Sequence, residues 1–121
     1  MIDHLGLAVK SFVRSRNFYA AALAPLGYSL VTEQATVAAF GPPGRPLFWI
    51  HAGSPAHTDV HLAFAAPDRA GVDAFYDAAL GAGAADNGPP GLRTGYHPNY
   101  YAAFVLDPDG NNIEAVCHLP E

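Results

Sequence analysis

Two histidines and one glutamate stand at positions from which they could act together. His4 and His61 each open a short alternating apolar stretch, "HLGLAV" and "HLAFAA", and Glu114 lies inside the apolar run "NNIEAV". A buried carboxylate without a partner is strongly unfavourable, so Glu114 must be paired, protonated, bound to a metal or turned to water. Two neutral imidazoles and a carboxylate on one face bind divalent Zn, Mn, Fe, Co or Ni and leave coordination positions open. The three residues are therefore candidate ligands of a divalent metal ion of unknown identity.

The two histidines belong to a unit that the chain uses twice. Several residues of the first copy recur with the same identity 57 positions later, among them His4 as His61, Phe18 as Phe75, Tyr19 as Tyr76 and Leu23 as Leu80. A repeat of this kind indicates one supersecondary unit present in two copies. Taken singly, a strand histidine is more often a core or surface residue than a ligand, and a glutamate in a terminal strand usually points to water. The equivalent placement of both histidines favours the metal interpretation.

Each copy is predicted to be a βαβββ unit. Alternation over residues 2–9 and 61–65 predicts strands whose large apolar residues face one way, while the histidines and small residues share an open face. Ser11 and Asp68 are the predicted N-caps of the helices that follow. Further strands are predicted at 28–32, 36–40 and 47–52 in the first unit, and at 84–87, 101–106 and 112–117 in the second. The predicted fold is α+β, with two modules (about 1–56 and 57–121) in one domain, forming a curled mixed sheet around a concave cavity that both histidines enter.

The segment "RTGYHPNYYAAF" is predicted to supply the other lining of this cavity. An aromatic, largely apolar pocket with a few polar tips is typical of small-molecule sites, and its predicted lining residues are Trp49, Arg93, Tyr96, Tyr100 and Phe104. His97 is a candidate general acid or base, and Tyr101 is a candidate hydrogen-bond donor to an oxyanion. The alternative is that the tyrosines only anchor the loop and that His97 is solvated.

The amino-acid composition restricts the classes of partner that the protein can bind. The net charge is −5 and the six Lys and Arg residues are scattered, which disfavours nucleic acid and anionic membranes, since both require a basic face. Cys117 is the single cysteine and allows no internal disulfide, as in a reducing cytoplasm. The N-terminal residues do not resemble a signal peptide, and no apolar run is long enough to span a membrane. We therefore expect a cytoplasmic protein that binds a small molecule.

Three segments resemble one known family. "DHLGLAV", "HLAFAA" and "DPDGNNIEAV" are similar to the vicinal oxygen chelate superfamily, which includes glyoxalase I, fosfomycin-resistance thiol transferases, extradiol dioxygenases and bleomycin-resistance proteins. The resemblance covers nearly the whole chain, and its last segment is the most specific. It implies paired βαβββ modules and metal ligands from the first, fifth and eighth strands, the places held here by His4, His61 and Glu114. It also implies a homodimer, in some members with each metal site shared between subunits.

The chain departs from each branch of the family in some respect. Glyoxalase I has a fourth ligand where this chain has Trp49, which cannot ligate a metal, and His51 is a weak substitute. Fosfomycin-type enzymes bind a phosphonate with several cations, whereas Arg93 is the only basic residue expected in the cavity loop. Extradiol dioxygenases share the two-histidine, one-carboxylate set but have two such double modules. Bleomycin-resistance proteins keep the fold and lose the metal, and the intact ligand set argues against that branch.

Two functional hypotheses follow. The first is a metal-dependent glyoxalase-like or dioxygenase-like enzyme, performing lyase, isomerase or oxygen-insertion chemistry on a small, aromatic or uncharged, oxygen-bearing substrate chelated to the metal. The second is a metal-free, bleomycin-resistance-like protein that sequesters a hydrophobic small molecule without turnover. Metal analysis of protein purified without chelator discriminates between them.

Overall fold

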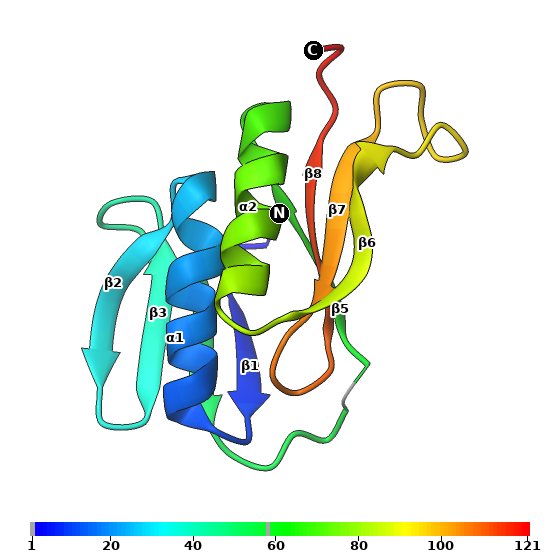
Figure 1. Ribbon diagram of the computed structural model, residues 1–121. Helices are drawn as coiled ribbons and strands as arrows, with labels where there is room; N and C mark the ends of the chain where they lie inside the picture. The colour runs from blue at the N-terminus through cyan, green and yellow to red at the C-terminus, as the bar shows by residue number, and fades with distance from the viewer. Residues whose placement is uncertain (1, 58) are drawn as a thin grey trace.

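The chain folds as two βαβββ units in succession. In the computed structural model, which describes residues 2–57 and 59–121, the first unit contains β1 (Leu5–Val9), α1 (Phe12–Leu23), a 3-10 turn η1 (Ala24–Leu26), β2 (Ser29–Gln34), β3 (Val37–Gly41) and β4 (Phe48–Ala52). The second contains β5 (His61–Ala65), α2 (Arg69–Gly81), β6 (Ala85–Leu92), β7 (Tyr101–Leu106) and β8 (Asn112–Cys117). The predicted α+β class and two-module organisation are confirmed (Figure 1).

Each module forms its own four-stranded mixed sheet. The strand orders are β1-β4-β3-β2 and β5-β8-β7-β6, so the two sheets have the same topology. The first strand of each module pairs in parallel with the last, and the remaining pairs are antiparallel. Figure 1 shows the two helices side by side, with β2 and β3 on one side of them and β6, β7 and β8 on the other. None of the helices in the described ranges is long and apolar enough to cross a membrane.

Both helices begin at the predicted caps. The Ser11 side chain accepts a hydrogen bond from the backbone N–H of Arg14 at 3.4 Å, and the Asp68 carboxylate accepts one from Gly71 at 2.7 Å. These bonds satisfy backbone donors that the first helical turn leaves without a partner. The caps fix where each helix starts and therefore how its apolar side meets the sheet.

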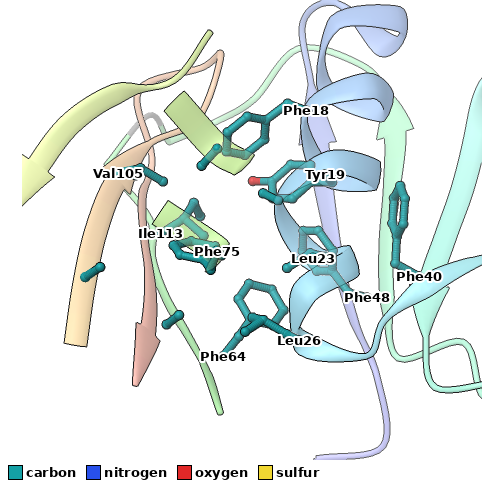
Figure 2. Packing of buried hydrophobic residues seen from close by; sticks show 14 of the residues in the cluster. Phe18, Tyr19, Leu23, Leu26, Phe40, Phe48, Phe64, Phe75, Val105 and Ile113 are labelled. Atoms are coloured by element: carbon teal, nitrogen blue, oxygen red, sulfur yellow. The ribbon is translucent and has the colours of Figure 1, made fainter. Parts of the chain in front are cut away.

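One hydrophobic core serves both modules. Figure 2 shows side chains of the two halves packed together, among them Phe18, Tyr19, Phe40 and Phe48 from the first module and Phe64, Phe75, Val105 and Ile113 from the second. The ring of Phe64 crosses the boundary, with its centroid 5.4 Å from Phe48 and 5.8 Å from Tyr28. The helix-facing sides of both sheets are thus used by a shared core. The opposite, open faces point away from it.

A buried polar link also joins the modules. The Tyr19 hydroxyl on α1 donates to Asp107 Oδ2 at 2.5 Å, and Asp107 accepts further hydrogen bonds from the backbone of Asp109 and from Asn111. Burial, followed by the negative charge of Asp107, raises the pKa of Tyr19 well above its usual value, so its hydroxyl stays protonated. The "DPDG" turn before β8 is therefore anchored to the helix of the other module.

Strand β6 is longer than predicted. The sequence indicates a strand over 84–87 followed by a loop, whereas β6 runs from Ala85 to Leu92 and includes Pro89 and Pro90. β6 is the edge strand of its sheet, and its pairing with β7 shifts register around Gly88. An edge strand tolerates proline because the outward N–H groups need no partner, and bulges absorb the irregularity. The glycine and proline residues of β6 are typical of loops, and for this reason the sequence predicts a strand only over 84–87.

Candidate functional site

Glu114 is buried and has two partners. Its side chain, on β8, is 1% exposed, with Oε1 lying 3.0 Å from Nε2 of His61. The Tyr100 hydroxyl donates a short hydrogen bond to the other carboxylate oxygen. Of the four possibilities for this carboxylate (paired, protonated, bound to a metal or turned to water), the structure shows pairing with neighbouring side chains.

Strand pairing places His61 beside Glu114. β5 and β8 run in parallel, with His61 opposite Asn112 and Ala63 opposite Glu114, so the histidine and the carboxylate project from the same face of the sheet. Nδ1 of His61 lies 3.0 Å from the carbonyl oxygen of Asn112, and the imidazole stacks on Phe104 with a centroid separation of 6.3 Å. These contacts turn Nε2 toward Glu114.

The His61–Glu114 contact requires a proton or a cation between its two facing atoms. When Nδ1 carries the proton that is donated to Asn112, Nε2 presents a lone pair, and the carboxylate oxygen 3.0 Å away presents another. A proton or a metal cation must then lie between these atoms. A histidine whose second nitrogen is bonded to a backbone carbonyl is the usual arrangement of a metal ligand. The donor atoms present therefore suit a divalent cation.

Tyr100 precedes β7 and covers the carboxylate from the loop side. Burial, then the hydrogen bond and charge of Glu114, raise the pKa of Tyr100 to about 12. The hydroxyl is therefore protonated and acts as a donor at neutral pH. The Tyr100 ring contacts those of Tyr96 and His118, with centroids 5.1 and 5.2 Å away. Tyr100 thus connects the buried carboxylate to the surface loop.

A cavity of about 520 Å³ opens over this pair and is lined by His61, Tyr96, Tyr100, Phe104, Asn112 and Glu114. Five of these six residues belong to the predicted ligand or lining set. Tyr96 is 73% exposed and lies at the mouth. The cavity has the aromatic wall and few polar groups that the sequence indicates for this module.

Three predicted residues of the second module lie outside the cavity. Tyr101 faces α2, where its hydroxyl donates to Asp73 at 2.6 Å, because neighbouring positions in a strand point to opposite faces. His97 is exposed in the loop, and its Nδ1 accepts the backbone N–H of Asn99 at 3.0 Å. Arg93 lies over the ring of Phe104 and donates to the carbonyl of Pro89 at 2.7 Å.

His4 and Trp49 line a second hollow, on the open face of the first module. Its volume is about 430 Å³, and Asp3 and Arg45 also contribute to it. His4 is exposed, with Nδ1 3.7 Å from the Asp3 carboxylate. Because the two open faces lie on opposite sides of the shared core, one chain does not bring His4 to His61 and Glu114 as expected. Over residues 2–57 and 59–121, no three His, Cys, Asp or Glu side chains converge to hold a metal ion.

Sequence reasoning missed three contributions. Asn112 orients His61 through its backbone carbonyl, which only the parallel β5–β8 register reveals. Tyr100 was expected as lining, but not as the hydrogen-bond partner of Glu114. Arg45 lies in the second hollow, and the turn-forming "GPPGRP" motif around it is the signal that could have drawn attention to it.

Solved structures with the same fold are similar over almost their full length. A glyoxalase/bleomycin resistance protein from Albidiferax ferrireducens T118 is 29% identical, with a TM-score of 0.82, covering 97% of this chain and 98% of that one. A glyoxalase/bleomycin resistance protein/dioxygenase family enzyme from Burkholderia phytofirmans PsJN has 17% identity and a TM-score of 0.74, covering 98% of both chains. A glyoxalase-related enzyme from Fulvimarina pelagi has 15% identity and the same TM-score, covering 97% of this chain and 87% of that one. At these last two identities, the likeness concerns the fold alone.

A comparison with curated proteins gives no significant match. The family model described as the Glyoxalase/Bleomycin resistance protein/Dioxygenase superfamily matches residues 1–115, which include both modules and the three candidate ligands. The chain belongs to the glyoxalase/bleomycin resistance protein/dioxygenase superfamily.

Proposed function

We propose that this protein is a metal-dependent enzyme that acts on a small, aromatic, oxygen-bearing substrate by lyase, isomerase or dioxygenase chemistry. The observation that supports it most is the buried Glu114 carboxylate facing Nε2 of His61 at 3.0 Å, at the base of an aromatic cavity. A carboxylate is unfavourable in such a place unless a positive charge compensates it. A divalent ion would polarise substrate oxygen atoms and stabilise negative charge developing on them.

The complete site is formed by two chains. His61 and Glu114 supply two ligands on the second module, and His4 supplies the third from the first module of a partner copy. A two-fold axis that places unlike modules face to face creates two equivalent sites at once. In support, a hollow of about 430 Å³ on the open face of the first module and one of about 520 Å³ on that of the second hold complementary parts of the ligand set.

The remaining cavity residues orient the proposed ligands and contact the substrate. Tyr100 holds Glu114 through its unshared carboxylate oxygen, so that Oε1 stays directed at His61. Phe104 forms an apolar wall, against which the His61 ring is already stacked. Trp49 of the partner copy would close the opposite side and exclude water. His97 and Tyr101 have no part in this scheme, because their side chains lie outside the cavity.

Metal analysis of the purified protein tests the proposal. His4→Ala and His61→Ala should each abolish stoichiometric metal binding, because two remaining ligands hold a divalent ion poorly. His97→Ala is the matched control, since this exposed loop histidine lies outside the cavity and the ligand set. Wild-type metal content in both ligand variants would refute the assignment.

Mixing two inactive variants tests whether the site is shared. His4→Ala and Glu114→Gln chains, unfolded and refolded together in equal amounts, should form mixed dimers in half of the cases. Each mixed dimer contains one intact site and one doubly altered site, so metal content should recover to about a quarter of the wild-type value. No recovery would place the ligands within one chain and refute the shared arrangement.

Sequestration of a hydrophobic molecule without metal is the second candidate. The separation of His4 from His61 and Glu114 within one chain favours it. Wild-type protein purified without chelator and free of metal, yet binding an aromatic ligand, would favour this function over the enzyme.

A further inference from the structure

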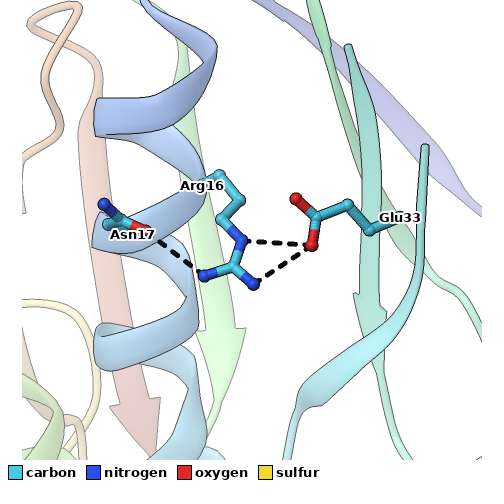
Figure 3. A network of polar contacts seen from close by, with 3 residues as sticks. All are labelled: Arg16, Asn17 and Glu33. Atoms are coloured by element: carbon cyan, nitrogen blue, oxygen red, sulfur yellow. Dashed lines mark hydrogen bonds and ion pairs between the residues drawn. The ribbon is translucent and has the colours of Figure 1, made fainter. Parts of the chain in front are cut away.

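Arg45 places a positive charge in the hollow that contains the proposed ligand His4. Arg16 pairs with Glu33 at 3.1 Å (Figure 3), while Arg69 and Arg93 lie over the rings of Tyr101 and Phe104. In the described part of the chain, the Arg45 guanidinium makes no ion pair or hydrogen bond, and it lines the hollow that also contains His4. In a protein with a net charge of −5, this is a local positive charge on an open sheet face.

The backbone that carries Arg45 is fixed. Its N–H donates to the carbonyl of Pro42 at 2.9 Å, closing a turn with Pro43 second and Gly44 third, at a φ of 74°. Proline and then a glycine with positive φ are the residues that type II turns require. A Cβ on Gly41 would lie 1.8 Å from the Arg45 carbonyl oxygen, so only glycine permits the turn to pack against β3. The guanidinium is therefore presented from a rigid base.

Trp49 provides a partly exposed aromatic surface in the same hollow. Its neighbours across the sheet are Gly6 on β1 and Ala39 on β3, both small. No heavy atom lies within 4 Å of the position where Gly6 would carry a Cβ. The sheet beside the indole is therefore open, and a flat ring could lie against it.

We propose that the hollow formed by Asp3, His4, Arg45 and Trp49 binds the carboxylate of an aromatic substrate. Arg45 pairs with the carboxylate through its planar fork of N–H donors, and Trp49 packs against the ring. Asp3 also lines the hollow and repels an anion, but it lies beside His4, so the carboxylate is directed to the Arg45 side. The inference rests on the proposed function, since His4 is a proposed ligand. It narrows the substrate to aromatic carboxylates.

The fluorescence of Trp49 reports the test directly, because it is the only tryptophan. The wild-type protein is titrated with benzoate and with benzamide, which has the same shape without the charge. Benzoate should bind about tenfold more tightly or better, since bonds between charged groups are about twice as strong as neutral ones. Arg45→Gln should remove this preference. Arg14→Gln is the control, because Arg14 lies in a different hollow beside α1 and should leave the preference unchanged.

The results separate this inference from the proposed function. Equal affinities of the wild-type protein for the two probes, or an unchanged preference in Arg45→Gln, would overturn the carboxylate site even if His4→Ala had lost its metal. A lost preference in Arg45→Gln with wild-type metal content supports it. Should Arg45→Gln fold poorly, Arg45→Lys keeps the charge without the planar fork and should weaken the preference, and an unweakened preference there would count against the fork.

Discussion

Replacing Tyr100 by phenylalanine removes one hydroxyl from the site and nothing else. That hydroxyl donates to a carboxylate that is 1% exposed, so water cannot readily take its place. Hydrogen bonds to charged groups contribute about 1.5–3 kcal/mol. We therefore expect Tyr100→Phe to lower the free energy of unfolding by about 2 kcal/mol at neutral pH.

The pH dependence gives a second measure of the same contact. Folding raises the pKa of Tyr100 from 10.0 to about 12. Because the folded state binds this proton more tightly, the stability it contributes is fully present below pH 10 and is lost as pH rises toward 12. This difference in pKa corresponds to about 2.7 kcal/mol of stability at most, and the partial exposure of Tyr100 reduces the contribution to about 1–2 kcal/mol. The difference in the free energy of unfolding between wild type and Tyr100→Phe (the stability gap) should therefore narrow as the pH rises from 10 toward 12.

Urea unfolding of both proteins at a series of pH values from about 8 to 12 measures the gap, since ΔG is obtained from each transition. Comparison with wild type cancels the other tyrosines whose pKa values are raised, Tyr19, Tyr76 and Tyr101. Tyr96→Phe is the matched control, because Tyr96 lines the same cavity at 73% exposure, and it should change stability by less than about 0.5 kcal/mol. A Tyr100→Phe protein as stable as the control, or a gap that stays constant up to pH 12, would refute the reasoning.

Three further substitutions test other parts of the structure. Glu114→Gln should reduce metal affinity by orders of magnitude, measured by metal analysis, and retained metal would contradict the ligand role. The stability of the metal-free protein should change by less than about 1 kcal/mol, because the new amide can accept a hydrogen bond from Tyr100 and donate one to His61. Tyr19→Phe should cost about 1–3 kcal/mol in urea unfolding, since buried Asp107 loses a donor, and an unaltered midpoint would contradict it. Ser15→Ala should leave the melting temperature unchanged or raise it, because the buried Ser15 hydroxyl has no hydrogen-bond partner among the residues that the structure describes. A large loss would reveal an unrecognised bond.

Much of the fold could be predicted because its signals are local. The caps at Ser11 and Asp68 and the strands over 101–106 and 112–117 follow from side-chain chemistry and alternation within a few residues. The repeat of 57 residues then gives the second module from the first. The pairing of His61 with the neighbourhood of Glu114 was also accessible, because a parallel first and last strand place both on one face.

The rest depends on relations that no short segment contains. Whether the open faces of the two modules meet or point apart is decided by which faces share the core, and the contact of Phe64 with Phe48 decides it here. Tyr101 was predicted to donate a hydrogen bond within the site, whereas Tyr100 does so, and this difference has a simpler cause. In the run "YAAF" that starts β7, aromatic and small apolar residues occupy both faces of the strand, so alternation does not specify which face Tyr101 takes.

Prolines 89 and 90 have a consequence for how this protein avoids uncontrolled association. An exposed sheet edge offers a row of backbone donors to which strands of other molecules can add, and such growth leads to aggregates. Proline has no N–H to offer, and the irregular register around Gly88 interrupts the remaining row. The outer edge of the second sheet is therefore a poor template for another strand. The association of copies proposed above uses the side chains of the sheet faces, where specificity can be encoded, and not the backbone of a sheet edge.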